Sequence, residues 1–159
     1  MKHTLAVLVE NQPGVLSHVA GLFARRGYNI ESLAVGETED SSISRITLVV
    51  EGDEKVIEQV SKQLNKQVEV IKVNDITNDE IVVRQLLLLK VAADLAARQE
   101  IMQIVEIFRC RIVDIGKRSL IVEATGDEEK IQAIIKSLRP FGIQELVRTG
   151  NVAMVRGVK

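Results

Sequence analysis

The chain has 159 residues, 46% of them hydrophobic, which is enough for one sizeable core or two modest ones. Its 21 basic and 22 acidic residues leave a formal net charge of −1, so no overall field attracts a nucleic-acid backbone or an anionic membrane. Aromatic residues make up only 3%, and the lone Cys110 excludes an internal disulfide. No apolar run is long enough for a signal or a membrane span, so we expect a cytoplasmic protein that does not bind a membrane. The balanced charge and the few aromatic residues lead us to expect no nucleic-acid binding.

The first half of the chain predicts the order strand, helix, strand, strand, helix, strand. Residues 4–9 form a short apolar run typical of a strand, and residues 13–26 repeat apolar side chains at helical spacing before a stop at Gly27. Residues 28–36 predict the next strand. Its apolar phase shifts near residues 31–32, which predicts a β-bulge.

A third strand, a second helix and a fourth strand complete this half. Alternating apolar positions up to Val50 indicate the strand, and Gly52 and Asp53 turn the chain into a helix. The expected apolar positions of these three elements are Ile46, Leu48, Val50, Val56, Ile57, Val60, Leu64, Val68, Val70 and Val73.

The second half repeats this order. Residues 52–57 align with residues 126–131 at a shift of about 74 positions, which indicates an internal repeat. The polar, turn-prone residues 74–80 are the expected linker. The elements expected beyond it are a strand over 81–91, a helix over 92–108 with Leu95 on its apolar face, a hairpin over 111–115 and 120–124, and extended segments over 143–147 and 152–155.

This order predicts an α+β protein built from two ferredoxin-like βαββαβ sandwiches, with domains over residues 1–76 and 80–159. Each such sheet has helices on one face only. We expect the uncovered faces or edges to be buried by a second copy of the chain, as a homodimer.

The sequence offers no constellation of catalytic or metal-binding side chains. We expect His18 to be a partly buried or interfacial residue, and Cys110 to be a small core residue. The acidic residues between Glu37 and Asp40 predict a solvated hairpin loop rather than a cation site. We therefore expect no catalytic residues, no metal and no cofactor in this chain.

Residues 10–16, with the sequence ENQPGVL, describe a strand that runs directly into a helix. Pro13 is compatible with a first helical turn, and Gly14 lets another molecule approach the main chain. Free N–H groups and the helix dipole favour an anion there by roughly 0.3–2 kcal/mol. The alternative is an ordinary strand-to-helix turn, and this segment by itself does not decide between the two.

Together with residues 21–33, with the sequence GLFARRGYNIESL, this segment resembles an ACT domain, and more closely the regulatory small subunit of acetohydroxyacid (acetolactate) synthase. The resemblance implies a chain without an active site of its own that binds and activates a large catalytic subunit. Thiamine diphosphate, Mg and FAD are then expected in that partner. It also implies feedback inhibition by a branched-chain amino acid, valine above leucine or isoleucine.

The resemblance places the effector beside the first helix, in a pocket shared by two copies. The backbone at Gly14 and Val15 would bind its carboxylate, Asn11 its ammonium, and apolar residues its side chain. A helix cap for Asn11 and a turn residue for Asn29 are the alternatives. The complete expected set is Asn11, Pro13, Gly14, Val15, Leu16, Asn29, Ile30, Leu33 and Val35.

Three other functions are alternatives to this one. A stand-alone amino-acid-sensing regulator of another enzyme or of transcription stays possible on the same fold. An RNA-recognition fold would need aromatic residues on its central strands, which hold Ile, Leu and Val, and a small enzyme lacks chemical groups. Arg25, Arg26 and the second half are candidates for contact with a catalytic subunit.

Overall fold

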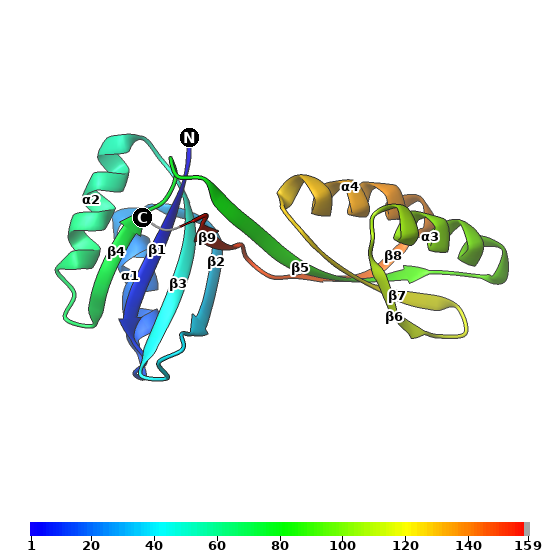
Figure 1. Ribbon diagram of the computed structural model, residues 1–159, viewed down its shortest axis with the longest axis horizontal. Coiled ribbons are helices and arrows are strands. Elements are labelled where there is room, and N and C mark those ends of the chain that lie inside the picture. Colours follow the sequence, from blue (N-terminus) through cyan, green and yellow to red (C-terminus); the bar gives the residue numbers. More distant parts are fainter. Residues whose placement is uncertain (158–159) are drawn as a thin grey trace. The chain divides into compact units, whose positions relative to one another are not determined.

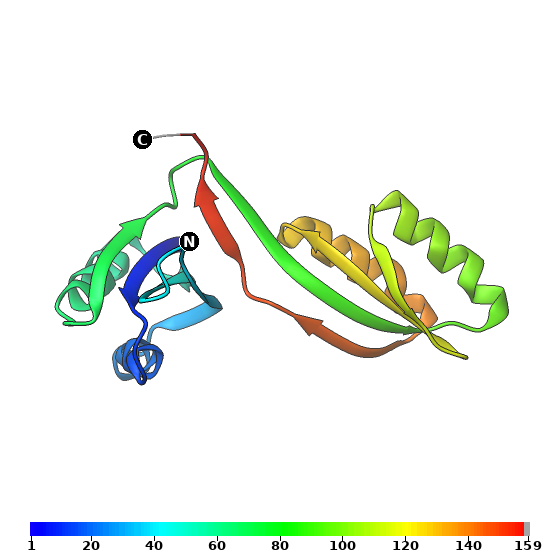
Figure 2. The ribbon, with the colours of Figure 1, turned by 60° about the horizontal axis from the view of Figure 1, so that its bottom comes forward.

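A computed structural model describes residues 1–157. The chain splits into two compact units, Met1–Val82 together with the segment from Asn151 onward, and Val83–Gly150. Each unit has a sheet with helices, and Figures 1 and 2 show the two helices of each unit on one face of its sheet. The predicted α+β class with ferredoxin-like units is confirmed. No helix within residues 1–157 is long and apolar enough to span a bilayer.

The first unit contains a four-stranded sheet of order β2-β3-β1-β4, in which every neighbouring pair is antiparallel. The register between β2 and β3 shifts between Ile30 and Ser32, so the predicted bulge is confirmed. The elements are β1 (Lys2–Glu10), α1 (Val15–Arg26), β2 (Asn29–Glu37), β3 (Ile43–Glu51), α2 (Glu54–Asn65) and β4 (Val70–Asp75).

The core of this unit lies between the sheet and the two helices. One face of α1 is buried, and the helix ends at Gly27, whose φ of 69° is the left-handed conformation that glycine adopts without strain. Asp53 caps α2 by accepting a hydrogen bond from the Val56 N–H at 2.9 Å, an arrangement worth about 1 kcal/mol. The buried helical residues are Val15, Val19, Leu22 and Phe23 of α1, and Ile57, Val60 and Leu64 of α2.

The second unit repeats this plan with strand order β6-β7-β5-β8. The last strand, β9, pairs with β5 and belongs to the first unit. The elements are β5 (Ile81–Ala92), α3 (Leu95–Ile107), β6 (Arg111–Ile115), β7 (Ser119–Gly126), α4 (Glu128–Leu138), a 3-10 turn (Arg139–Phe141), β8 (Ile143–Arg148) and β9 (Val152–Val155).

The internal repeat holds at the level of single side chains. Asp127 caps α4 as Asp53 caps α2, accepting from the Lys130 N–H at 2.9 Å. The buried positions of α2, shifted by about 74, all fall on buried positions of α4. Those of α4 are Ile131, Ile134, Ile135 and Leu138, so α4 has one buried position, Ile135, that α2 lacks.

Several local predictions were wrong. Val68 lies in the turn before β4 and is 90% exposed, so it is not a strand residue. The expected linker begins too early, because β4 extends to Asp75 and Ile76 is buried. The helix expected from residue 92 starts at Leu95, because Asp94 caps it, and Leu95 is 88% exposed rather than on an apolar face.

The end of the described chain lies against the first sheet. The Asn151 N–H donates to Ser32 Oγ at 2.7 Å, and the Arg45 guanidinium donates to the Ala153 carbonyl at 2.6 Å. Ser32 and Arg45 lie on the sheet face away from the helices, so the chain itself contacts a face that we expected a second copy to cover. The unit division therefore differs from the expected ranges 1–76 and 80–159, whose status as separate domains stays a prediction.

Candidate functional site

The turn between β1 and α1 leaves the start of the helix uncapped. The helix begins at Val15, two residues later than expected, so Pro13 lies in the preceding turn rather than in the first helical turn. Gly14 occupies the N-cap position with φ 85°, and no side chain caps the helix. Within residues 1–157, the N–H groups of Gly14, Leu16 and Ser17 have no hydrogen-bond partner. These donors can bind an anion.

Space is open in front of these donors. A Cβ built on Gly14 would meet no atom within 4 Å, and the Leu16 side chain is 42% exposed, whereas Val15 is buried in the core. Because φ is positive at Gly14, side chains other than Gly, Asn or Asp are strained at this position. The local sequence thus produces an exposed main-chain surface beside an apolar side chain.

Asn11 links this turn to the loop between β2 and β3. Its Nδ2 donates to Glu37 Oε1 at 3.2 Å and to the Ser41 carbonyl at 2.9 Å, and its N–H donates to the Ser42 carbonyl at 2.8 Å. Asn11 is therefore not a helix cap. The amide nitrogen is engaged, whereas no described residue donates to its Oδ1, which leaves that oxygen as an acceptor.

Val35 and Leu33 are the predicted wall residues at this end of the sheet. Val35 pairs with Ile46, which in turn pairs with Val7, on the helix-covered face. Val35 is 45% exposed and stands two residues from Glu37, the side chain that contacts Asn11. Leu33 is partly buried against the core one row further along the sheet.

Asn29 and Ile30 lie at the opposite end of the same sheet. Asn29 pairs with Glu51 and Ile30 with Val50, beside the start of β1 rather than its end. The reason is that α1 runs back along the sheet, so residues that follow its last turn are remote from those that precede its first. Within one chain, Asn29 and Ile30 are therefore separated from the predicted effector residues near Gly14.

The remaining polar residues do not form catalytic clusters. His18 is exposed rather than partly buried, and its Nδ1 lies 2.9 Å from Glu69 Oε1. Burial raises the pKa of the Cys110 thiol, which disfavours a reactive thiolate. Hydrogen bonds from Ser42 lower the pKa of Asp40, which organises the β2–β3 loop. Within residues 1–157 no three His, Cys, Asp or Glu side chains are placed to hold a metal ion.

Glu37 and Ser17 belong to the candidate site by geometry, although no sequence pattern selected them. The sequence predicts Glu37 in a solvated loop, and its contact with Asn11 spans 26 positions of the chain. Ser17 contributes an N–H group, which no residue-type pattern reveals.

Comparison with known proteins gives a consistent result. Residues 5–72 match the model of the AHAS small subunit-like ACT domain, and residues 84–157 match that of the small subunit of acetolactate synthase. The chain is 60% identical to a probable acetolactate synthase small subunit of Archaeoglobus fulgidus, covering 100% of this chain and 99% of that protein. It is 51% identical to the acetolactate synthase small subunit of Mycobacterium leprae, covering 98% and 92%.

A solved structure agrees over the whole length. The crystal structure of the small subunit of acetolactate synthase from Thermotoga maritima is 45% identical and superimposes with a TM-score of 0.93, covering 100% of this chain and 99% of that chain.

Proposed function

The chain belongs to the family of acetolactate synthase small subunits, and we propose that it binds and activates a large, thiamine-diphosphate-dependent catalytic subunit and makes it sensitive to valine. It acts as a homodimer in the cytoplasm and holds no cofactor of its own. Thiamine diphosphate, Mg and FAD belong to the catalytic partner.

The uncapped start of α1 is the observation that supports this proposal most directly. A free amino acid presents a carboxylate, which the N–H groups of Gly14, Leu16 and Ser17 would bind. It also presents an ammonium group, for which Asn11 Oδ1 and the Glu37 carboxylate are the nearby acceptors. Leu16 and Val35, both partly exposed, offer apolar contact to an aliphatic side chain.

The positions of Asn29 and Ile30 explain why the proposed effector site requires a dimer. Because Asn29 and Ile30 lie at the other end of the sheet, they reach an effector at Gly14 only from a second copy. An effector held by two copies favours one arrangement of the pair. It can alter the catalytic subunit only through its differential affinity for that arrangement, a coupling of typically 1–3 kcal/mol.

The test replaces Gly14 by Asp, which places a carboxylate where the effector carboxylate is proposed to bind. The matched control is Gly14→Asn, which has the same shape, tolerates the left-handed backbone and adds no charge. We expect calorimetry to show valine affinity reduced by at least about tenfold in Gly14→Asp relative to Gly14→Asn, because two carboxylates repel at one site. Activation of the catalytic subunit should survive in both variants.

Equal valine affinity in the two variants would discard the site. Titrating leucine and isoleucine in parallel ranks the effectors, since one methylene in an apolar pocket changes binding by only about 1–3 kcal/mol.

A further inference from the structure

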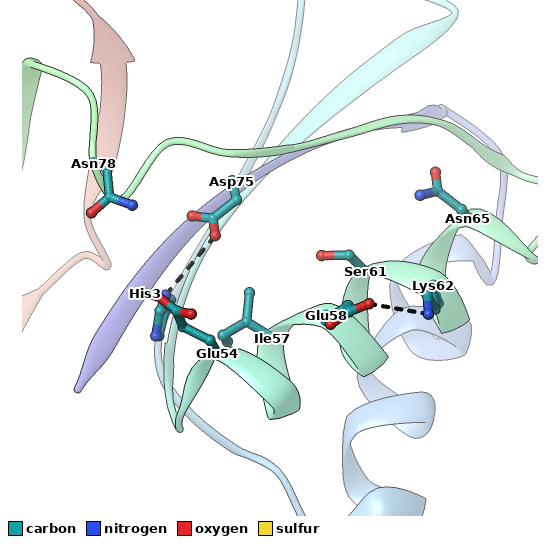
Figure 3. A pocket seen from close by; sticks show the side chains of 9 residues that line it. All are labelled: His3, Glu54, Ile57, Glu58, Ser61, Lys62, Asn65, Asp75 and Asn78. Carbon is teal, nitrogen blue, oxygen red and sulfur yellow. Dashed lines mark ion pairs between the residues drawn. The ribbon is translucent and has the colours of Figure 1, made fainter.

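A pocket lies in the first unit, between α2 and the segment that follows β4. Its volume is about 420 Å³, which suits a small molecule. Figure 3 shows Asp75 and Asn78 on one side and the α2 side chains on the other, with His3 between them. The lining residues are His3, Glu54, Ile57, Glu58, Ser61, Lys62, Asn65, Asp75 and Asn78.

His3 is the buried polar residue of this pocket. It is only 4% exposed, and within residues 1–157 its Nε2 has no hydrogen-bond partner. Its Nδ1 lies 3.5 Å from Thr77 Oγ1 and 4.0 Å from Asp75 Oδ2. An unsatisfied polar atom in this position is costly, and a core that served packing alone would hold an apolar side chain there.

The second unit provides that apolar counterpart. His3 pairs with Val50 two residues before Gly52, and Leu87 pairs with Ala124 two residues before Gly126, so the two residues occupy matching positions. Ser61 of α2 likewise corresponds to Ile135 of α4. Leu87 and Ile135 are buried, at 0% and 4% exposure. The pocket therefore lies where two apolar side chains of the repeat are replaced by polar ones.

The second unit also shows which side chain pairs with a carboxylate in the first turn of the second helix. Glu128, in the first turn of α4, forms an ion pair with Arg148, whose Nη2 also donates to Gln85 Oε1 at 2.8 Å. Glu54 is the matching residue of α2. No hydrogen bond or ion pair engages its carboxylate within residues 1–157. The first unit thus has a carboxylate at Glu54, as the second unit has at Glu128, but within the described residues no guanidinium is bound to it as Arg148 is bound to Glu128.

The charged side chains around the pocket are mostly acidic. Glu54, Glu58 and Asp75 contribute three carboxylates, and among residues 1–157 Lys62 is the one Lys or Arg that lines the pocket. The Lys62 ammonium lies 3.2 Å from Glu58, so it is not available to Glu54. Asp75 has Oδ1 engaged by Thr77, and its Oδ2 has only the His3 ring nitrogen at 4.0 Å nearby in the pocket. An anion is disfavoured there, and the donor geometry for a metal ion is absent among the described residues.

We propose that this pocket binds a small organic cation with N–H donors, a primary ammonium or a guanidinium, and that Glu54 and Asp75 are its carboxylate partners. The ligand takes the place that the Arg148 guanidinium occupies in the second unit. Charge-assisted hydrogen bonds to carboxylates make donor-bearing cations stronger ligands than cations without donors. This site is separate from the effector site proposed at Gly14 and does not depend on it.

The experiment titrates the full-length ¹⁵N-labelled protein with methylguanidinium chloride, n-butylammonium chloride and tetramethylammonium chloride at constant ionic strength. We expect the first two to shift the amide signals of Ser61, Asn65 and Asp75. Tetramethylammonium, which has no N–H, should not shift them. Glu54→Gln, a surface change, should weaken the binding at least tenfold.

Two further variants control the result. His3→Leu combined with Ser61→Ile copies the apolar side chains of the second unit and should abolish the shifts. Glu145→Gln, which removes an exposed carboxylate in the second unit, should leave them unchanged. The proposal is overturned if no cation shifts these signals, if tetramethylammonium is equally effective, or if Glu54→Gln binds as the parent does.

Discussion

The first helices of the two units begin in opposite ways. Gly14 precedes α1 in a left-handed conformation and offers no side chain, whereas Asp94 precedes α3 and accepts a hydrogen bond from the Ala97 N–H at 2.8 Å. A carboxylate at the start of α3 satisfies one donor and repels any second carboxylate. The same fold therefore has an uncapped first helix in one unit and a capped first helix in the other.

The second helices differ in what lies beneath them. Beneath α4 the unit is packed by Leu87 and Ile135 and locked by the ion pair of Arg148 and Glu128. Beneath α2 the matching positions hold His3 and Ser61, beside a pocket. The repeat thus preserves the buried helix positions that form each core, whereas the side chains at His3 and Ser61 differ from those at Leu87 and Ile135.

Exchanging the core residue tests this contrast most severely. Leu87→His places an imidazole at a fully buried position, so we expect the second unit to lose about 3 kcal/mol or more. Amide hydrogen exchange on the whole chain, resolved by unit, measures the loss. A change below about 1 kcal/mol would show that this position tolerates polarity in both units.

The reverse exchange, His3→Leu, should stabilise the first unit by about 1–3 kcal/mol, because it removes a buried nitrogen without a partner and fills the position as Leu87 does. Amide hydrogen exchange also measures this gain in stability, with Lys90→Ala in the second unit as a control. Destabilisation would mean that the contact between His3 and Thr77 outweighs the unsatisfied Nε2.

Removing the cap of the second unit tests the comparison of helix starts. Asp94→Ala should cost about 1 kcal/mol, because the Ala97 N–H loses its acceptor. Urea unfolding followed by a probe in the second unit measures the cost. The control is Asp94→Asn, which keeps a capping oxygen at the same position. Gly14→Ala in the first unit is unsuitable as a control, because the positive φ at Gly14 strains an alanine. Similar losses in Ala and Asn variants would argue against the capping bond.

The smallest expected effect depends on pH. Partial burial raises the pKa of Glu128, but hydrogen bonds from Gln132, Gln85 and Arg148, with the charge of Arg148, outweigh it and lower the pKa to about 2. A lowered pKa stabilises the folded unit above the unfolded value near 4.5, and this contribution disappears as the pH falls toward 2. Because Glu128 is about half exposed, we expect no more than about 1 kcal/mol.

Glu128→Gln should therefore flatten the stability of the second unit between pH 5 and about 2, with little change in the first unit. Thermal unfolding across this range measures it. A steep pH dependence that persists in the variant would assign the effect to other carboxylates.

Local sequence patterns predicted the order of the elements, the helix faces, the bulge in β2 and the repeat between Ile57 and Ile131. Each of these rests on spacing between neighbouring residues, which a strand or helix converts directly into a face. The same local signals marked the turn at Gly14, although they placed the helix start two residues early.

Contacts between residues far apart in the chain could not be predicted in this way and follow from the assembled fold. It separated Asn29 from Gly14, joined Asn11 to Glu37, placed His3 against α2 and returned the segment after Asn151 to the first unit. These contacts depend on strand order and register, which are set by the packing of the whole unit rather than by any one segment. A pattern read along the chain carries no information about them until the sheet is assembled.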